Sequence, residues 1–313
     1  MGSWIGHIAP GMFKTMSTNE YQFRLLFFCL YSGMIFILLA FWWHINNCAR
    51  YIRSLVHEKN ENTRQEKYKF QGSTTYPCYC LPGKFIRRLR TESIIKIFFI
   101  SIHFTIEAHD GYSSQPRPHI GTANANHMAM LFGFFLGSCV EILVHYKVPL
   151  PKRINQVMGV LAFAIEGLMF LFHLHARGIV DIHIHQLLVV TIACSAISSI
   201  GECFDPNNFW FIVLRSFFVL TQGTWFIQAA YVLFPQTTNP SFVWNDSHES
   251  VSLLTMCYAY HLAGNAFLLI VVYLLVYLFV SCTSKLNYNQ IQDDEPFDGY
   301  KLIVNGNDEE NGL

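Results

Sequence analysis

Seven stretches of this 313-residue sequence are apolar enough, and nearly long enough, to cross a lipid bilayer. The hydrocarbon core of a bilayer is ~30 Å thick, and a helix needs ~20 mostly apolar residues to span it. No proline lies inside any stretch, so each can form an unbroken helix that satisfies its own backbone hydrogen bonds, as lipid requires. The stretches cover residues 24–45, 93–110, 127–146, 153–173, 183–203, 209–234 and 251–281.

The composition supports a membrane protein rather than a soluble one. Hydrophobic residues make up 52% of the chain and charged residues only 13%, whereas soluble domains carry about 25% charged residues. The 21 basic and 21 acidic residues cancel, so the net charge gives no reason to expect a nucleic-acid partner. The sequence therefore predicts an all-α bundle of seven transmembrane helices, with the lipid bilayer as its environment.

The distribution of Lys and Arg predicts the orientation, because cytosolic segments next to membrane helices are enriched in these residues. The connections assigned to one side contain fifteen Lys and Arg residues, ten of them in residues 46–92, and those on the other side contain three. We expect a luminal or extracellular N-terminus and a cytosolic C-terminus. The domains expected are a luminal segment 1–23, a membrane domain 24–281 with a cytosolic loop 46–92, and an acidic, disordered tail 282–313.

Two sequence features predict covalent modification on opposite sides of the membrane. Asn245-Asp246-Ser247 is an N-glycosylation sequon and falls in a connection assigned to the lumen. Cys78 and Cys80 lie in the basic cytosolic loop, where they are either palmitoylated or left as reduced, unmodified thiols. We expect a glycoprotein without an extracellular disulfide framework, because no cysteine falls in a luminal segment.

Ionisable residues inside membrane spans cost ~2.5–3.5 kcal/mol each on insertion scales, so each needs a physical reason. Arg24, Lys96 and Arg215 lie near span ends, where their side chains can extend to the interface. Glu141 and His145 have the same explanation at the cytosolic end of the third span.

The luminal halves of the spans carry a larger set of polar residues, and we expect them to face one cavity. His103 and Glu107 share a helix face, which favours a hydrogen bond between them. Histidines two residues apart point to nearly opposite sides, so only one of each pair can face the cavity. Asp181 is a candidate N-cap. The set comprises Glu107, His127, Glu166, His173, His175, Asp181, His183, His185, Gln222, Gln228 and His261.

Three interpretations of these residues remain open. They form a structural network between helices, or a site that handles protons or ions, or a metal site. In the metal interpretation His127, His173, His185 and His261 hold zinc, and Glu166 is the general base of a hydrolase that acts on a lipid. Their spacing matches no specific metal motif.

Several sequence runs resemble the transmembrane protein 45 family, over residues 33 to 285. They are Glu166-Gly167-Leu168 leading to His173, Asp181-Ile182-His183-Ile184-His185, Gln222-Gly223-Thr224-Trp225-Phe226-Ile227-Gln228 and Tyr258-Ala259-Tyr260-His261. The resemblance implies a seven-span protein of secretory membranes, such as the Golgi, another endomembrane or the plasma membrane, with no established activity. On the family pattern, motif positions fall on Glu107, His127, Glu166, His173, Asp181, His185, Gln228 and His261.

The sequence departs from this family in residues 12–32, which separate an N-terminal Gly-His motif from the first span and are either a genuine insertion or an artefact. Seven-span metal hydrolases similar to alkaline ceramidases offer a second comparison, because they carry paired histidines on their last helix. It departs from them because Asn265 stands where a second histidine would follow His261.

The run Gly133-Phe134-Phe135-Leu136-Gly137 favours close helix packing, either inside the bundle or in a homo-oligomer. Our first hypothesis is a non-enzymatic membrane protein whose luminal cavity binds a small ligand, an ion or a partner, and the zinc-dependent lipid hydrolase is the alternative.

Overall fold

The computed structural model describes residues 18–60, 70–76, 91–113, 122–172, 178–234 and 244–288. These residues form seven α-helices and, within those ranges, no β-strand, which confirms the predicted all-α fold. Each predicted apolar stretch lies in its own helix. The helices are α1 (Thr18–Asn60), α3 (Thr91–Ser113), α4 (Thr122–His145), α5 (Ile154–Phe172), α6 (Ile179–Phe204), α7 (Phe209–Leu233) and α8 (His248–Tyr288).

Six of the seven helices, all except α3, are long and apolar enough to cross a membrane. α3 is less apolar overall because it carries Glu92, Lys96, His103 and Glu107. Three of these four, Glu92, His103 and Glu107, are buried inside the protein. The opposite face of α3 exposes large apolar side chains, namely Ile94, Ile95, Phe98, Phe99, Ile102 and Ile106. A polar inner face and an apolar outer face are what a helix in contact with lipid requires.

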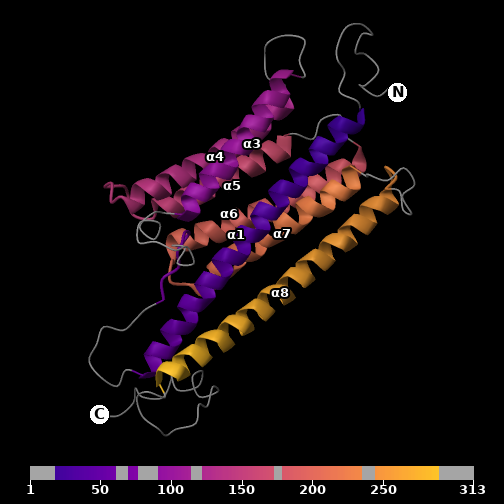
Figure 1. Ribbon diagram of the computed structural model, residues 1–313. Helices are drawn as coiled ribbons and strands as arrows, with labels where there is room; N and C mark the ends of the chain where they lie inside the picture. Colours follow the sequence, from indigo (N-terminus) through magenta and orange to yellow (C-terminus); the bar gives the residue numbers. More distant parts are fainter. Residues whose placement is uncertain are drawn as a thin grey trace, which may run out of the picture.

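The helices pack side by side in the order α3, α4, α5, α6, α7 and α1, and α8 lies against α1, α7 and α6 (Figure 1). Consecutive helices run in opposite directions, so the bundle has two distinct ends. We call the end that carries Glu107, His127 and His185 the histidine end. We call the other end, which carries Glu92, Lys96, Glu141, Glu202 and Arg215, the charged end.

The closest packing in the bundle joins α1 to α7. A Cβ atom placed on Gly223 of α7 would lie 2.7 Å from the carbonyl oxygen of Gly33 on α1, and the reverse distance is also 2.7 Å. Only two glycines can pass at this separation, so the pair fixes where the two helices cross. Gly133 of α4 similarly lies against Ala162 and Ile165 of α5, which places the predicted glycine motif in packing within the bundle.

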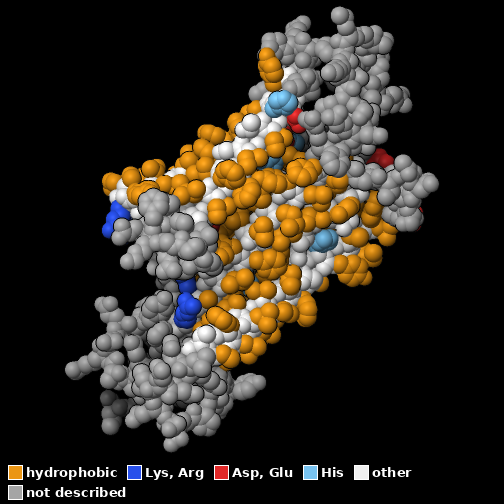
Figure 2. All heavy atoms as spheres, in the orientation of Figure 1, with side chains coloured by type: hydrophobic (Ala, Val, Ile, Leu, Met, Phe, Trp, Pro, Cys, Tyr) orange, Lys and Arg blue, Asp and Glu red, His pale blue; other side chains and the backbone are white. Residues whose placement is uncertain are grey.

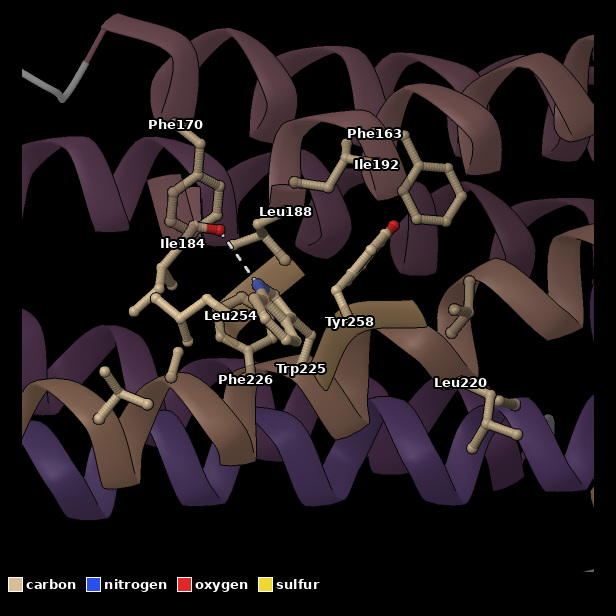
Figure 3. Close-up of a cluster of buried hydrophobic side chains, with 14 of the residues drawn as sticks. Phe163, Phe170, Ile184, Leu188, Ile192, Leu220, Trp225, Phe226, Leu254 and Tyr258 are labelled. Carbon is tan, nitrogen blue, oxygen red and sulfur yellow. Dashed lines mark hydrogen bonds between the residues drawn. The ribbon is translucent and has the colours of Figure 1, made fainter. Parts of the chain in front are cut away.

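The hydrophobic core lies mainly between α5, α6, α7 and α8 (Figure 3). Trp225 is fully buried at its centre and donates a 3.0 Å hydrogen bond from its indole N–H to the carbonyl oxygen of Ile184. Tyr258 packs edge-on against the same indole ring. A partner for the indole N–H is needed because a buried, unpaired polar group is costly. This bond therefore ties α7 to α6 as well as filling the core.

Two helices extend well beyond a membrane's thickness. α1 continues through residues 46–60, which the sequence predicts to be part of a cytosolic loop. α8 has 41 residues. Their extensions pack together around Cys48, Ile52 and Val280 at the charged end. Large apolar side chains cover the face of the bundle drawn in Figure 2, and the Lys and Arg side chains visible there lie toward the charged end. This distribution fits a bundle whose middle is surrounded by lipid.

Candidate functional site

A cavity of about 270 Å³ lies between α1, α3, α4 and α5, and α6 and α7 contribute to its inner wall. Its lining runs along α4 from His127 to Glu141, about 21 Å at ~1.5 Å per residue. The lining is mostly apolar, with polar groups toward both ends. Apolar lining residues include Phe28, Ile35, Leu39, Phe134, Phe163 and Val219.

The cavity reaches the protein surface along the seam between α1 and α3. Leu38 of α1 and Ile95 of α3 both line the cavity, yet they are 63% and 46% exposed. Further along the seam, Tyr31 bridges the two helices by edge contacts with Phe99 and His103. At this seam, side chains alone separate the cavity from the apolar outer surface of the bundle.

Glu107 organises the histidine end of the cavity. One carboxylate oxygen accepts a 2.7 Å hydrogen bond from Asn124, and the other lies 3.0 Å from Nδ1 of His127. The predicted pairing of Glu107 with His103 is replaced by these contacts with α4. His103 instead packs edge-on against Phe28, with ring centroids 4.0 Å apart. It is 6% exposed, and its Nε2 atom is buried without a hydrogen-bond partner among the described residues.

Glu166 lines the same cavity from α5. Its Oε1 atom accepts a 2.6 Å hydrogen bond from the amide of Gln222 on α7. Glu166 is 3% exposed, and its Oε2 atom has no partner within the described part of the chain. A buried carboxyl oxygen left unpaired costs free energy, so a hydrogen bond from a ligand to this atom would be favourable.

The charged end of the cavity is held by ion pairs. Lys96 of α3 lies 2.6 Å from a carboxylate oxygen of Glu141 on α4 and 3.4 Å from Glu92 on its own helix. Glu92 also accepts hydrogen bonds of 2.9 Å from the indole N–H groups of both Trp42 and Trp43 on α1. These contacts join α1 to α3, so they fix the part of the cavity wall that these two helices form at the charged end.

Arg215 corrects one sequence-based expectation. Its side chain was expected to extend toward the interface, but it is buried, forms an ion pair with Glu202 of α6 and stacks on the ring of Trp43. The reason is that α6 and α7 are joined by a short turn, so the long side chain of Arg215, seven residues after the turn, can reach Glu202, three residues before it. Lys96 and Glu141 are likewise paired with each other rather than extended separately to the interface.

The segment 70–76 covers the charged end. Tyr76 donates a hydrogen bond from its phenol to Asn47 of α1, and its backbone N–H donates a 2.7 Å bond to Glu92. Burial raises the pKa of the Tyr76 phenol, and the charge of Arg50, which lies over the ring, opposes that rise. The phenol is therefore a neutral donor that helps to hold this segment against the helices.

Two further predicted residues pair with each other away from the cavity. His185 lies 2.9 Å from a carboxylate oxygen of Asp181 on the same helix. His183 hydrogen-bonds the hydroxyl of Thr255 on α8 at 2.8 Å, so the two histidines do face different neighbours.

Asp181 is not the N-cap of α6, because the helix starts at Ile179 after Gly178. The carboxylate of Asp246 accepts the backbone N–H of Val180 instead.

His261 and Gln228 lie outside this cavity. His261 is half-buried on α8 and contacts Trp225 edge-on, with ring centroids 5.6 Å apart. Gln228 is partly buried on α7 and is absent from the cavity lining. Asn265, the position compared with a second ligand histidine, donates hydrogen bonds to Thr221 and Thr224 of α7. These residues hold α8 to α7, so the predicted set of polar groups divides into separate clusters.

The described residues contain no group of three or more His, Cys, Asp and Glu side chains that could hold a metal ion. His127 pairs with Glu107, His185 with Asp181, and His261 contacts Trp225. These three histidines therefore do not fit a shared zinc ion. His173, His175, Cys78 and Cys80 lie outside the described residues.

Sequence reasoning missed two contributors to the cavity. Asn155 of α5 lines it near Glu141, and its Oδ1 atom is buried and unpartnered within the described ranges. Glu202 is the counter-charge of Arg215. A signal for Glu202 existed in the sequence, because opposite charges on either side of a short helix connection can meet when one of the side chains is as long as that of Arg.

Comparison with known proteins gives a relationship but no activity. Residues 152–274 match the model of a family of unknown function, DUF716. The chain is 24% identical over 289 residues to transmembrane epididymal protein 1A of Mus musculus, covering 87% of this chain and 80% of that protein. The human transmembrane epididymal protein 1 is 25% identical over 151 residues, covering 47% of this chain and 54% of that protein. Over most of its length, this multi-pass helical membrane protein is therefore similar to the transmembrane epididymal proteins, with its DUF716 match in α5 to α8.

Proposed function

We propose that this protein is a non-enzymatic, ligand-binding protein of secretory membranes, similar to the transmembrane protein 45 family, whose ligand occupies the cavity between α1, α3, α4 and α5. One observation carries the proposal. Glu166 lines a cavity of about 270 Å³ and is 3% exposed, and its Oε2 atom is buried without a partner among the described residues. A buried polar group without a partner is expected to be satisfied by something that binds there.

The volume and shape of the cavity support a small ligand. Binding sites for small molecules typically enclose ~300–1,000 Å³, are mostly apolar and contain a few placed polar groups. At about 270 Å³ this cavity lies just below that range, and it has such groups at both ends. The geometry does not support the zinc-dependent hydrolase. Glu166 is hydrogen-bonded to Gln222, and none of the described histidines shares a metal-sized site with it.

The proposed orientation places the histidine end in the lumen and the charged end in the cytosol. The loop between α1 and α3 and the turn between α4 and α5 carry ten of the 21 Lys and Arg residues, and both leave from the charged end. In this orientation α3 is the seventh membrane span, because its exposed face is apolar along its length. Asn245 is exposed at the histidine end, where a luminal glycan can be attached.

The cavity can be filled without disturbing the helices, which gives a direct test. A Cβ atom on Gly159, which lines the cavity, would meet nothing within 4 Å. Gly264, an exposed glycine of α8 outside the lining, has equal space and is the matched control. Native mass spectrometry of the purified full-length protein should detect a bound small molecule in the wild type and in Gly264→Phe, but not in Gly159→Phe. Equal occupancy in both variants, or no bound molecule in the wild type, would contradict the proposal.

A further inference from the structure

We infer that the ligand of this cavity is a single-chain lipid with a primary amine head group, held by Glu166 and His103. This inference rests on the proposed function and names the chemical class of the ligand. It depends on the shape of the cavity, on the route into it, and on the balance of charge along its lining.

The shape of the cavity favours one extended chain. The lining extends about 21 Å along α4 at ~1.5 Å per residue, which is most of the ~30 Å thickness of the hydrocarbon core. A volume of about 270 Å³ spread over that length is narrow. Phe134, Phe163 and Met158 line its middle section, where they offer apolar contacts to a hydrocarbon chain. A lipid with two chains exceeds this space.

The route into the cavity favours a ligand that arrives from the bilayer. Leu38 and Ile95 line the cavity and are also exposed on the outer surface of α1 and α3. The surface around this seam is apolar and includes Phe98 and Ile102. A chain can therefore pass from surrounding lipid into the cavity without crossing a polar surface, whereas a water-soluble ligand would first have to enter the hydrocarbon core.

Glu166 and His103 lie at the same depth. Glu107 of α3 contacts His127 of α4, and Gly133 of α4 faces Ala162 of α5. His103 is one helical turn from Glu107, and Glu166 is one turn from Ala162. Both side chains line the cavity and are therefore level with the part of α4 between His127 and Gly133.

The charge of the described lining residues favours a cation over an anion. Three carboxylates (Glu141, Glu166 and Glu202) and two cationic side chains (Lys96 and Arg215) line the cavity. Lys96 is paired with Glu141, and Arg215 with Glu202. Glu166 alone has no cationic partner among the described residues. A buried carboxyl without a counter-charge is neutralised by a proton, and an ammonium group beside it would let it ionise and form an ion pair, whereas a carboxylate or phosphate would not.

The open hydrogen-bonding atoms match the same head group. An ammonium group has three N–H donors and no acceptor. Glu166 Oε2 is an acceptor, and so is His103 Nε2 in the tautomer that carries its proton on Nδ1. Phe28 and Phe170 line this end of the cavity, and aromatic faces attract a nearby cation. The amine would thus satisfy two of the buried atoms that have no partner among the described residues.

The test uses three photoreactive, alkyne-tagged probes with the same long chain and different head groups: a primary amine, an alcohol and a carboxylate. The purified full-length protein is labelled with each probe, and the labelled peptides are located by mass spectrometry. The amine should label the wild type most strongly, on peptides of α1, α3, α4 and α5. Glu166→Gln, which keeps the side-chain shape and an acceptor for Gln222, should lower amine labelling about tenfold or more, because hydrogen bonds to charged groups are among the strong ones.

Two controls separate the possible failures. Asp181→Asn removes a carboxylate at the same end of the bundle outside the lining, and it should leave amine labelling unchanged. Gly159→Phe should abolish labelling by every probe, and Gly264→Phe should not. Stronger labelling by the alcohol or carboxylate, or an equal effect of Glu166→Gln on all three probes, overturns the amine inference and leaves the proposed function standing. Labelling that survives Gly159→Phe overturns both.

Competition on the wild-type protein needs no variant and covers the case in which Glu166→Gln fails to fold. An untagged long-chain amine should displace the amine probe at a lower concentration than the matching alcohol does. Displacement at equal concentrations would overturn the assignment of the head group.

Discussion

Arg215 is buried at the charged end, and Glu202 is the group that balances its charge. Replacing one member of a buried ion pair leaves the other charge uncompensated, and this costs ~3–5 kcal/mol. Arg215→Met should therefore lower the free energy of unfolding by about that amount, measured by SDS titration in mixed micelles. The double variant Arg215→Met/Glu202→Met should recover most of the loss. A double variant as unstable as the sum of the two single variants would show that the pair does not act as a unit.

Asn265 holds α8 to α7 through two threonine hydroxyls, and its contribution should be smaller. Hydrogen bonds between membrane helices contribute ~0.6 kcal/mol on average and at most ~1.7 kcal/mol. Asn265→Val should lower the free energy of unfolding within that range in the same SDS titration. A loss as large as that of Arg215→Met would mean that Asn265 has a role beyond this contact. Gly264→Ala, at the preceding exposed position, is the control and should not lower stability.

At the residue scale, the sequence identified many polar side chains that matter but not all of their partners. Glu166 and Gln222 were both singled out, and they form a hydrogen bond. His261 was expected near Glu166, yet it contacts Trp225 on α7. Helical spacing places a residue on a face of its own helix, but which neighbouring helix covers that face is decided by packing. That information is absent from the spacing itself.

At the element scale, the crossing of α1 and α7 depends on a pair of glycines. Gly223→Ala would place a Cβ atom 2.7 Å from the carbonyl oxygen of Gly33, which is backbone and cannot rotate away. Overpacking of this kind costs ~1–3 kcal/mol. The variant should lose that much stability in SDS titration, while Gly264→Ala, which meets nothing within 4 Å, should not. Equal stability of the two variants would contradict the close crossing.

Helix positions followed from apolar length, because each stretch near ~20 residues became a helix. Helix ends followed less well. α1 continues to Asn60 beyond the apolar stretch that ended at residue 45, since its extension packs on α8 through Cys48 and Ile52. α3 was the least apolar stretch in sequence, and its inward-facing Glu92 and Glu107 explain why. Contacts between helices therefore determine where these helices end, and local composition alone does not predict those ends.

For the whole molecule, the proposed orientation makes Asn245 a luminal residue. In cells, wild-type protein should carry one N-linked glycan that is removed by a glycosidase, and Asn245→Gln should migrate like the deglycosylated form. A sequon inserted into the connection between α1 and α3 is the control and should stay unmodified, because that connection is cytosolic. Modification of the inserted sequon, with Asn245 unmodified, would reverse the orientation.

The account depends most on the cavity between α1, α3, α4 and α5. The most direct measurement is a cryo-electron microscopy map of the wild-type protein in lipid nanodiscs. We expect elongated density along the cavity, not attributable to the chain, with one end in contact with Glu166 and His103 and the other toward Asn155. A map in which α1 and α3 pack together, so that side chains fill this space and Glu166 meets only protein, would contradict the account.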